Sequence, residues 1–187
     1  PDSTSLEFNT QILLQGTAAS PGQAFGESFV LDRKRSFTEL RRLRFDRIFY
    51  YEDLEEAIYK TEQQLLELQK SVEENLSDSA SLIFTSHLLI LKDKSFNNEI
   101  KARINTGINP PAALLGVCEN YIKAFSESEN PFVREKVEDL EDLIQRIFSN
   151  LLGDDNVPVN AENKIVISKS LYPSDILMLA SEGAAGI

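Results

Sequence analysis

Apolar positions recur every three or four residues through the middle of the chain. Between residues 51 and 76 the recurring positions are Leu54, Ile58, Thr61, Leu65, Leu68, Val72 and Leu76. This period is that of one helix face, so it predicts a long amphipathic helix. A second run, over residues 131–151, places Val133, Val137, Leu140, Ile144, Ile147 and Leu151 on one face. Neither helix would be stable in water with its apolar stripe exposed, so each must pack against another part of the protein.

Residues that favour helix ends bound these segments. Asn130 before Pro131 is a favourable helix start, and Gly153 is expected where the second long helix ends. Shorter helices are expected over residues 79–91, after Ser95 as a cap, and over residues 112–125. Four main helices with short connections predict an up-and-down bundle.

The two ends of the chain have a different pattern. Residues 12–14 and 25–31 are typical of short strands on either side of a Pro-Gly turn. Residues 164–168 form a β-type run, Pro173 begins a short helix, and residues 184–187 begin another strand. Strand, helix and strand in this order predict a parallel α/β unit. The predicted fold class is therefore mainly α, with a helical bundle inserted into a partial α/β layer and residues 33–47 as the crossover.

Composition limits the classes of function. The chain has 187 residues and a net charge of −11, and its middle part, residues 51–150, contains 19 acidic and 10 basic side chains. This charge argues against nucleic acid as a partner. Two interpretations of the acidity stay open: a solvated helix surface, or electrostatic steering of a basic partner. Residues 1–10 lack the features of a signal peptide and an initiator Met, so the chain is expected to be a piece of a longer protein.

The residues show no catalytic arrangement. His87 is the single histidine, which excludes a metal site built from several histidines. It is expected to be a polar side chain at the edge of the core, and Cys118 a small buried apolar one. The carboxylate pairs Glu138–Asp139 and Glu141–Asp142 are adjacent rather than facing, so they are expected to form a charged surface.

Four segments together resemble a known family. They are GTAASPGQAFG at residues 16–26, LIFTSHLLILKDKSFNNEI at 82–100, REKVEDLEDLIQRIFSNLLG at 134–153 and IVISKSLYPSDILML at 165–179. In this order they resemble the phosphoenolpyruvate-protein phosphotransferases, the Enzyme I family of the phosphotransferase system. The resemblance covers roughly residues 14–187.

The resemblance implies a domain organisation and an activity. Residues 14–35 and 154–187 would form a partial phosphohistidine α/β domain, residues 36–153 a helical domain that binds the carrier HPr, and residues 1–13 an N-terminal extension or linker. The parent would be a cytoplasmic, homodimeric transferase (a kinase in the broad sense) in sugar transport. Phosphoenolpyruvate and magnesium would be bound by a missing C-terminal domain. The phosphorylated histidine would lie beyond residue 187, so this chain is expected to have no catalytic residue, metal site or cofactor of its own and to be inactive alone.

The resemblance also implies a docking surface for an HPr-like phosphocarrier protein. By matched position its contacts would be Asp78, Leu82, Thr85, His87, Leu89, Ile90, Asp93, Lys94, Ser95, Phe96, Leu115 and Lys136. Leu89, Ile90 and Phe96 are expected to line an exposed cleft. Positions 85, 94 and 95 are often acidic in the family but are not acidic here, which suits a nitrogen-type paralogue with the carrier NPr.

Two other functions stay open. One is a non-catalytic acidic helical adaptor that binds some other basic protein. The other is the corresponding part of a dikinase, although dikinases lack a carrier-docking bundle between the halves of the layer.

Overall fold

The computed structural model describes residues 15–31, 37–45, 47–76, 78–153 and 160–187. The strand predicted at residues 12–14 and the linker predicted at residues 1–13 lie outside this part of the chain. Within it the elements are, in order, β1 (Glu27–Val30), α1 (Phe37–Leu40), α2 (Tyr51–Asn75), α3 (Asp78–Leu91), α4 (Lys94–Asn105), α5 (Pro110–Ser126), α6 (Pro131–Leu152), β2 (Lys164–Ile167) and α7 (Pro173–Ser181).

The long helices begin and end largely as their sequence predicts. The Asn130 side chain accepts a hydrogen bond from the Phe132 amide at 3.0 Å, which caps α6. Gly153 ends this helix with a φ of 68°, a left-handed conformation that glycine adopts without steric cost. The cap predicted for α4 is wrong, because Asp93 and not Ser95 precedes the first turn. Its carboxylate accepts from the Phe96 amide at 2.7 Å.

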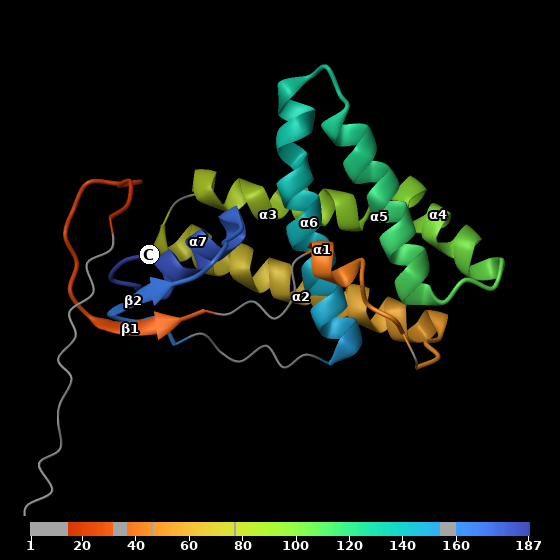
Figure 1. The fold of residues 1–187 in the computed structure, drawn as a ribbon, viewed down its shortest axis with the longest axis horizontal. Coiled ribbons are helices and arrows are strands. Elements are labelled where there is room, and N and C mark those ends of the chain that lie inside the picture. The colour runs from red at the N-terminus through yellow and green to blue at the C-terminus, as the bar shows by residue number, and fades with distance from the viewer. Residues whose placement is uncertain (1–14, 32–36, 46, 77, 154–159) are drawn as a thin grey trace, which may run out of the picture.

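The four main helices form two hairpins that cross, where a simple up-and-down bundle was predicted. In Figure 1, α2 and α3 run side by side, and the hairpin of α5 and α6 crosses them steeply. Helix α4 follows α3 after a short break and packs on α5. The hairpins cross because the buried residues of α6 reach beyond one stripe, so that this helix packs against α1, α2, α3 and α5.

The main hydrophobic core lies where these helices meet. Helix α6 contributes Leu140, Leu143, Ile144, Ile147, Phe148 and Leu151, all buried, and α2 contributes Leu54, Ala57, Leu65 and Val72. Cys118 of α5 is fully buried in the same core, as expected for a small apolar side chain. Desolvation raises the pKa of its thiol well above the ordinary value, so the thiolate is disfavoured.

Both ends of the chain contribute to a small parallel sheet. Strands β1 and β2 pair in parallel, from Glu27 opposite Lys164 to Val30 opposite Ile167. Gly26 allows this close approach, because a Cβ there would lie 2.6 Å from the Asn163 carbonyl oxygen. Beyond α7 the chain returns to β2, and the strand predicted there appears as one parallel bridge between Ile165 and Gly186.

The predicted fold class is confirmed: the protein is mainly helical, with a partial α/β layer built from both ends around the helices. A second, smaller core of Ala161, Val166 and Leu179 lies between β2 and α7. The domain boundaries given by residue number stay a prediction. In the part of the chain that the structure describes, no helix is both long and apolar enough to span a bilayer.

The neighbours Leu65 and Leu66 allow a test of the α2 packing. Leu65 is fully buried, whereas Leu66 on the same helix is 40% exposed. We expect Leu65→Ala to lower the free energy of unfolding by about 2–5 kcal/mol, since it leaves a cavity in the main core. Leu66→Ala should lower it by less than about 1 kcal/mol. Urea denaturation of both variants measures the difference, and equal losses would contradict the described packing.

Candidate functional site

Helix α3 presents two exposed leucines on one side. Leu82 is 62% and Leu89 is 69% exposed, and their separation of seven positions corresponds to about two helical turns, which places both side chains on one face. Lys136 of α6 reaches this side of α3, where its Nζ donates to Ser86 Oγ at 3.2 Å. Phe132, one turn before Lys136 on the same side of α6, is 76% exposed. We call Leu82, Leu89, Phe132 and Lys136 the α3 face.

The residues predicted to contact a carrier fall into three groups. The exposed ones are Asp78, Leu82, Leu89, Asp93, Lys94, Ser95 and Lys136. Thr85 and Ile90 are half-buried, and the Thr85 hydroxyl accepts from Gln69 Nε2 at 3.2 Å. His87, Phe96 and Leu115 are buried, so the structure does not place them on the surface.

The predicted exposed cleft of Leu89, Ile90 and Phe96 is therefore wrong as described. Phe96 has no exposed surface and packs edge-to-face on Tyr121 of α5, with ring centroids 5.4 Å apart. Leu115 is buried on α5 as well. The packing of α4 on α5 covers Phe96, so this side chain stabilises the core and is not available to a partner. The resemblance assigned Phe96 to the cleft by its matched position along the chain, which does not determine the direction of the side chain.

His87 points inward from α3 instead of lying at the edge of the core. Its side chain is fully buried, and its Nε2 lies 3.7 Å from Oδ2 of Asp142 on α6. Burial lowers the pKa of His87, because desolvation disfavours the imidazolium more than the nearby Asp142 and Asp139 carboxylates favour it. His87 therefore stays neutral at a lower pH than an exposed histidine would.

The carboxylate pairs predicted to form a charged surface are partly buried. Asp142 is fully buried and Asp139 is 6% exposed, so that expectation is wrong for both. The Lys136 ammonium lies 2.7 Å from Asp139 Oδ2, and Arg146 Nε lies 3.3 Å from Asp142 Oδ1. Buried carboxylates need such partners. Glu141 is less buried, and desolvation followed by repulsion from Glu138 raises the pKa of its carboxyl group.

Sequence reasoning missed two features of this region. Phe132 lies off the apolar stripe of α6, and an aromatic residue off the stripe of an amphipathic helix is the signal that could have marked it as surface. The second feature is the hydrogen bonding of Ser174 on α7. Its hydroxyl donates to Asp142 Oδ2 and accepts from Arg146 Nη2 at 2.8 Å. Only the four-residue spacing of Asp142 and Arg146 hinted at an ion pair.

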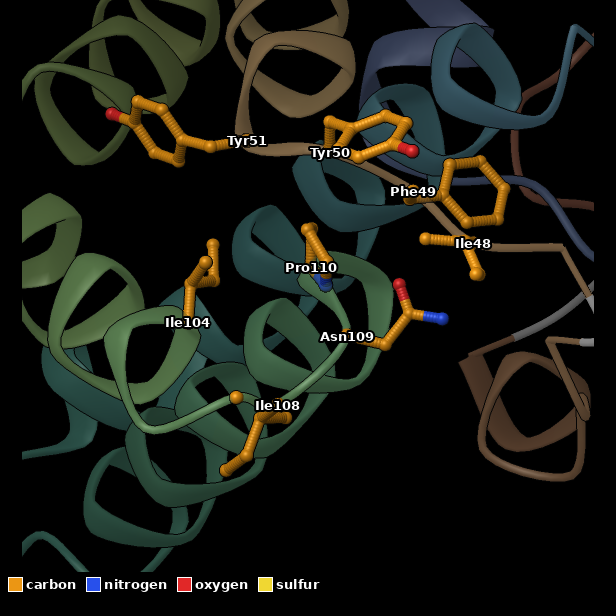
Figure 2. Close-up of a pocket in the computed structure, with 9 residues that line it drawn as sticks. Ile48, Phe49, Tyr50, Tyr51, Ile104, Ile108, Asn109 and Pro110 are labelled. Carbon is orange, nitrogen blue, oxygen red and sulfur yellow. The ribbon is translucent and has the colours of Figure 1, made fainter.

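A pocket of about 370 Å³ lies elsewhere on the molecule, between the start of α2 and the turn from α4 to α5. Figure 2 shows that mostly apolar side chains line it, among them Ile48, Tyr50, Ile108 and Pro110. None of its lining residues belongs to the α3 face or to the predicted carrier contacts. Within the described residues, no group of three or more His, Cys, Asp or Glu side chains is arranged to hold a metal ion.

Comparison with known proteins identifies the family. The sequence profile of the family described as "PEP-utilising enzyme, N-terminal" matches residues 15–136. The chain therefore belongs to this family, which comprises the N-terminal parts of PEP-utilising enzymes. More narrowly, it is a homologue of the N-terminal region of Enzyme I.

Its relatives agree with this assignment. The chain is 31% identical over 175 residues to the phosphoenolpyruvate-protein phosphotransferase of Priestia megaterium, covering 89% of this chain and 29% of that protein. It is 27% identical over 176 residues to the enzyme of the same name from Bacillus subtilis (strain 168), covering 92% of this chain and 31% of that protein. The chain thus spans about 30% of the length of these relatives.

Two solved structures share the fold. An NMR structure of Enzyme I superposes with a TM-score of 0.69 at 22% identity, over 92% of this chain and 69% of that one. The N-terminal domain of "Enzyme 1 - Nitrogen" superposes with a TM-score of 0.63 at 19% identity, over 89% of this chain and 69% of that one. Both support the arrangement of helices and sheet described above.

Burial of His87 predicts a pH dependence of stability. Its pKa is lowered in the folded protein, so the unfolded chain binds a proton that the folded chain does not. We expect stability to be fully present above pH 6.5, the ordinary value, and to fall as the pH drops towards the folded pKa. The slope is at most about 1.4 kcal/mol per pH unit.

Urea unfolding at a series of pH values, compared with His87→Gln, measures this effect. Because His87 is the only histidine, the variant should lack this component whatever its overall stability. Parallel pH profiles for the two proteins would show that His87 is not the source.

Proposed function

We propose that this chain is the carrier-docking part of a phosphoenolpyruvate-protein phosphotransferase and that an HPr-like phosphocarrier binds the α3 face. The observation that most supports this is the pair of exposed leucines, Leu82 and Leu89, beside Lys136. Exposed apolar side chains that lie together and have a polar rim are typical of protein interfaces.

The charges around the α3 face favour a carrier with a mixed or weakly basic contact surface. Asp78 and Asp93 are exposed at the two ends of α3, whereas Lys94 and Ser95 follow immediately after Asp93. The chain as a whole has a net charge of −11, which would steer a basic protein towards it over long range. The surroundings of the α3 face are less acidic than the chain as a whole, so the binding energy would come mainly from the apolar contacts.

The remaining steps of the activity would use parts of the parent protein outside this chain. The phosphorylated histidine would follow residue 187, and phosphoenolpyruvate and magnesium would be bound by a further domain of a cytoplasmic, homodimeric enzyme. Residues 14–35 and 154–187 would form the start of the phosphohistidine domain, and residues 36–153 the carrier-binding domain. The role of this chain would be to receive the carrier and hold it for phosphoryl transfer.

Substitution of Leu89 tests the docking site. We expect Leu89→Asp to weaken binding of HPr or NPr by at least about 1–2 kcal/mol in titration calorimetry, because it puts a charge into the apolar centre of the contact. Ile48→Asp is a matched control, since Ile48 is 73% exposed but lies at the pocket instead of the α3 face.

Three outcomes are informative. Loss of binding with Leu89→Asp alone supports the proposal, and the wild-type affinities for HPr and NPr tell which carrier is the better partner. Unchanged affinity, with the fold intact by circular dichroism, removes Leu89 from the interface. If neither carrier binds the wild-type chain, a different basic partner, and hence an adaptor, becomes the favoured function.

Phosphorylation provides a second test. His87 has no exposed surface, so its nitrogens are closed to a phosphoryl donor. We expect intact-mass analysis of the 187-residue chain to show no added phosphoryl group after incubation with phosphoenolpyruvate, magnesium and carrier. A phosphoryl group mapped to His87 would contradict both the burial of this side chain and its exclusion from catalysis.

A further inference from the structure

One oxygen atom of Asp142 lies between two groups that can bind it. Asp142 Oδ2 accepts the hydrogen bond of the Ser174 hydroxyl from α7. The same Oδ2 lies 3.7 Å from Nε2 of His87 on α3. The side chains of Asp142 and His87 are 1% and 0% exposed, so water does not compete for this atom.

Helix α7 connects the two cores of the molecule. Leu177 packs against the main helical core, whereas Leu179 belongs to the small core beside the sheet. Ser174 lies in the first turn of α7 and is fully buried. Its hydrogen bonds to Asp142 and Arg146 therefore fix the start of α7, and with it the α/β layer, against α6.

His87 is placed to compete for this carboxylate. Both of its ring nitrogens are buried, and neither has a hydrogen-bond partner among the residues that the structure describes. A hydrogen bond needs a separation of about 2.7–3.2 Å, so the 3.7 Å gap is closed by a shift of less than about 1 Å. A protonated imidazole would gain a charge-assisted hydrogen bond from this shift, which a neutral one gains only weakly.

We propose that Asp142 is a positioning residue shared by α3 and α7: when His87 takes up a proton from solvent, Oδ2 moves from the Ser174 hydroxyl to His87. One of the two hydrogen bonds between Ser174 and α6 is then lost while the one from Arg146 remains, and the α/β layer is held less firmly on the helices. Arg146 keeps its ion pair through Oδ1, so the carboxylate turns without leaving the site. Relevance for the carrier rests on the proposed function, because α3 also presents the docking leucines.

Several helices pack against α3, and the charged groups that act on His87 all belong to α6. Helix α6 supplies Asp142, Asp139, Arg146 and Lys136, which act on the His87 charge. On α2, Glu73 accepts from Ser81, nearly two turns before His87 on α3. On α7, the Asp175 carboxylate accepts from the backbone amide of Tyr172. Asp142 is the carboxylate closest to His87, so competition for it decides the response.

A pH titration by NMR tests the proposal without any carrier. Since His87 is the only histidine, its imidazole C–H signal reports one site, while the amide signals of residues 174–176 report the start of α7. We expect both sets to move with a common midpoint below 6.5 as the pH falls. In His87→Gln the α7 amides should lose this transition.

Ser174→Ala tests whether the Ser174 hydroxyl and His87 compete for Asp142 Oδ2 or merely lie near each other. It removes the rival donor for Oδ2, so we expect it to raise the pKa of His87 by at least about 0.5. Ser181→Ala is the matched control, because Ser181 is on the same helix but its hydroxyl donates to the Met178 carbonyl. The amide spectrum of each variant verifies that the fold is intact.

Several results would overturn the proposal. These are an unchanged His87 pKa in Ser174→Ala, an equal rise in Ser181→Ala, persistence of the α7 transition in His87→Gln, and absence of any His87 titration above the acid unfolding of the chain. Carrier binding is not measured in this experiment, so failure here leaves the proposed docking function untouched, and failure of docking leaves this coupling untouched.

Discussion

Burial of α6 is the constraint on which the arrangement of the other helices depends. Its large apolar side chains, from Leu140 to Leu151, point towards more than one neighbour. Helices α1, α2, α3 and α5 all pack against it, and two crossing hairpins achieve this where parallel axes would cover only one stripe. The position of α3, and thus of its exposed leucines, follows from the need to cover one side of α6.

Covering α6 on several sides also buries polar atoms. Asp139, Asp142 and Gln145 lie on the same buried length of helix as the apolar residues. Each buried carboxylate is compensated by a cation one turn away, Lys136 for Asp139 and Arg146 for Asp142. Ser174 of α7, which lies outside the helical hairpins, hydrogen-bonds to the pair of Asp142 and Arg146. The position of α7 therefore depends on a polar contact as well as on apolar packing.

The sequence predicts the positions of the helices along the chain better than it predicts which of their side chains are buried by neighbouring helices. Stripes with a period of three to four residues located α2 and α6 almost to their ends, because a period of this length is specific to a helix with one buried side. A stripe defines one buried side only, so the burial of Asp142 behind it was not foreseen. Resemblance to a family matches positions along the chain but not the direction of side chains, and Phe96 was therefore assigned to the surface although it packs on Tyr121.

Helix α3 contains both an exposed leucine of the α3 face and the buried His87 that lies beside Asp142. Leu89 faces outward and His87, two residues earlier, faces Asp142, so one displacement of the helix changes both environments. A partner that prefers one position of α3 must then alter the separation of His87 and Asp142. By thermodynamic reciprocity, the state of that carboxylate must alter the affinity for the partner by the same factor. In the proposed function, the buried side of α3 would therefore influence docking together with the exposed side.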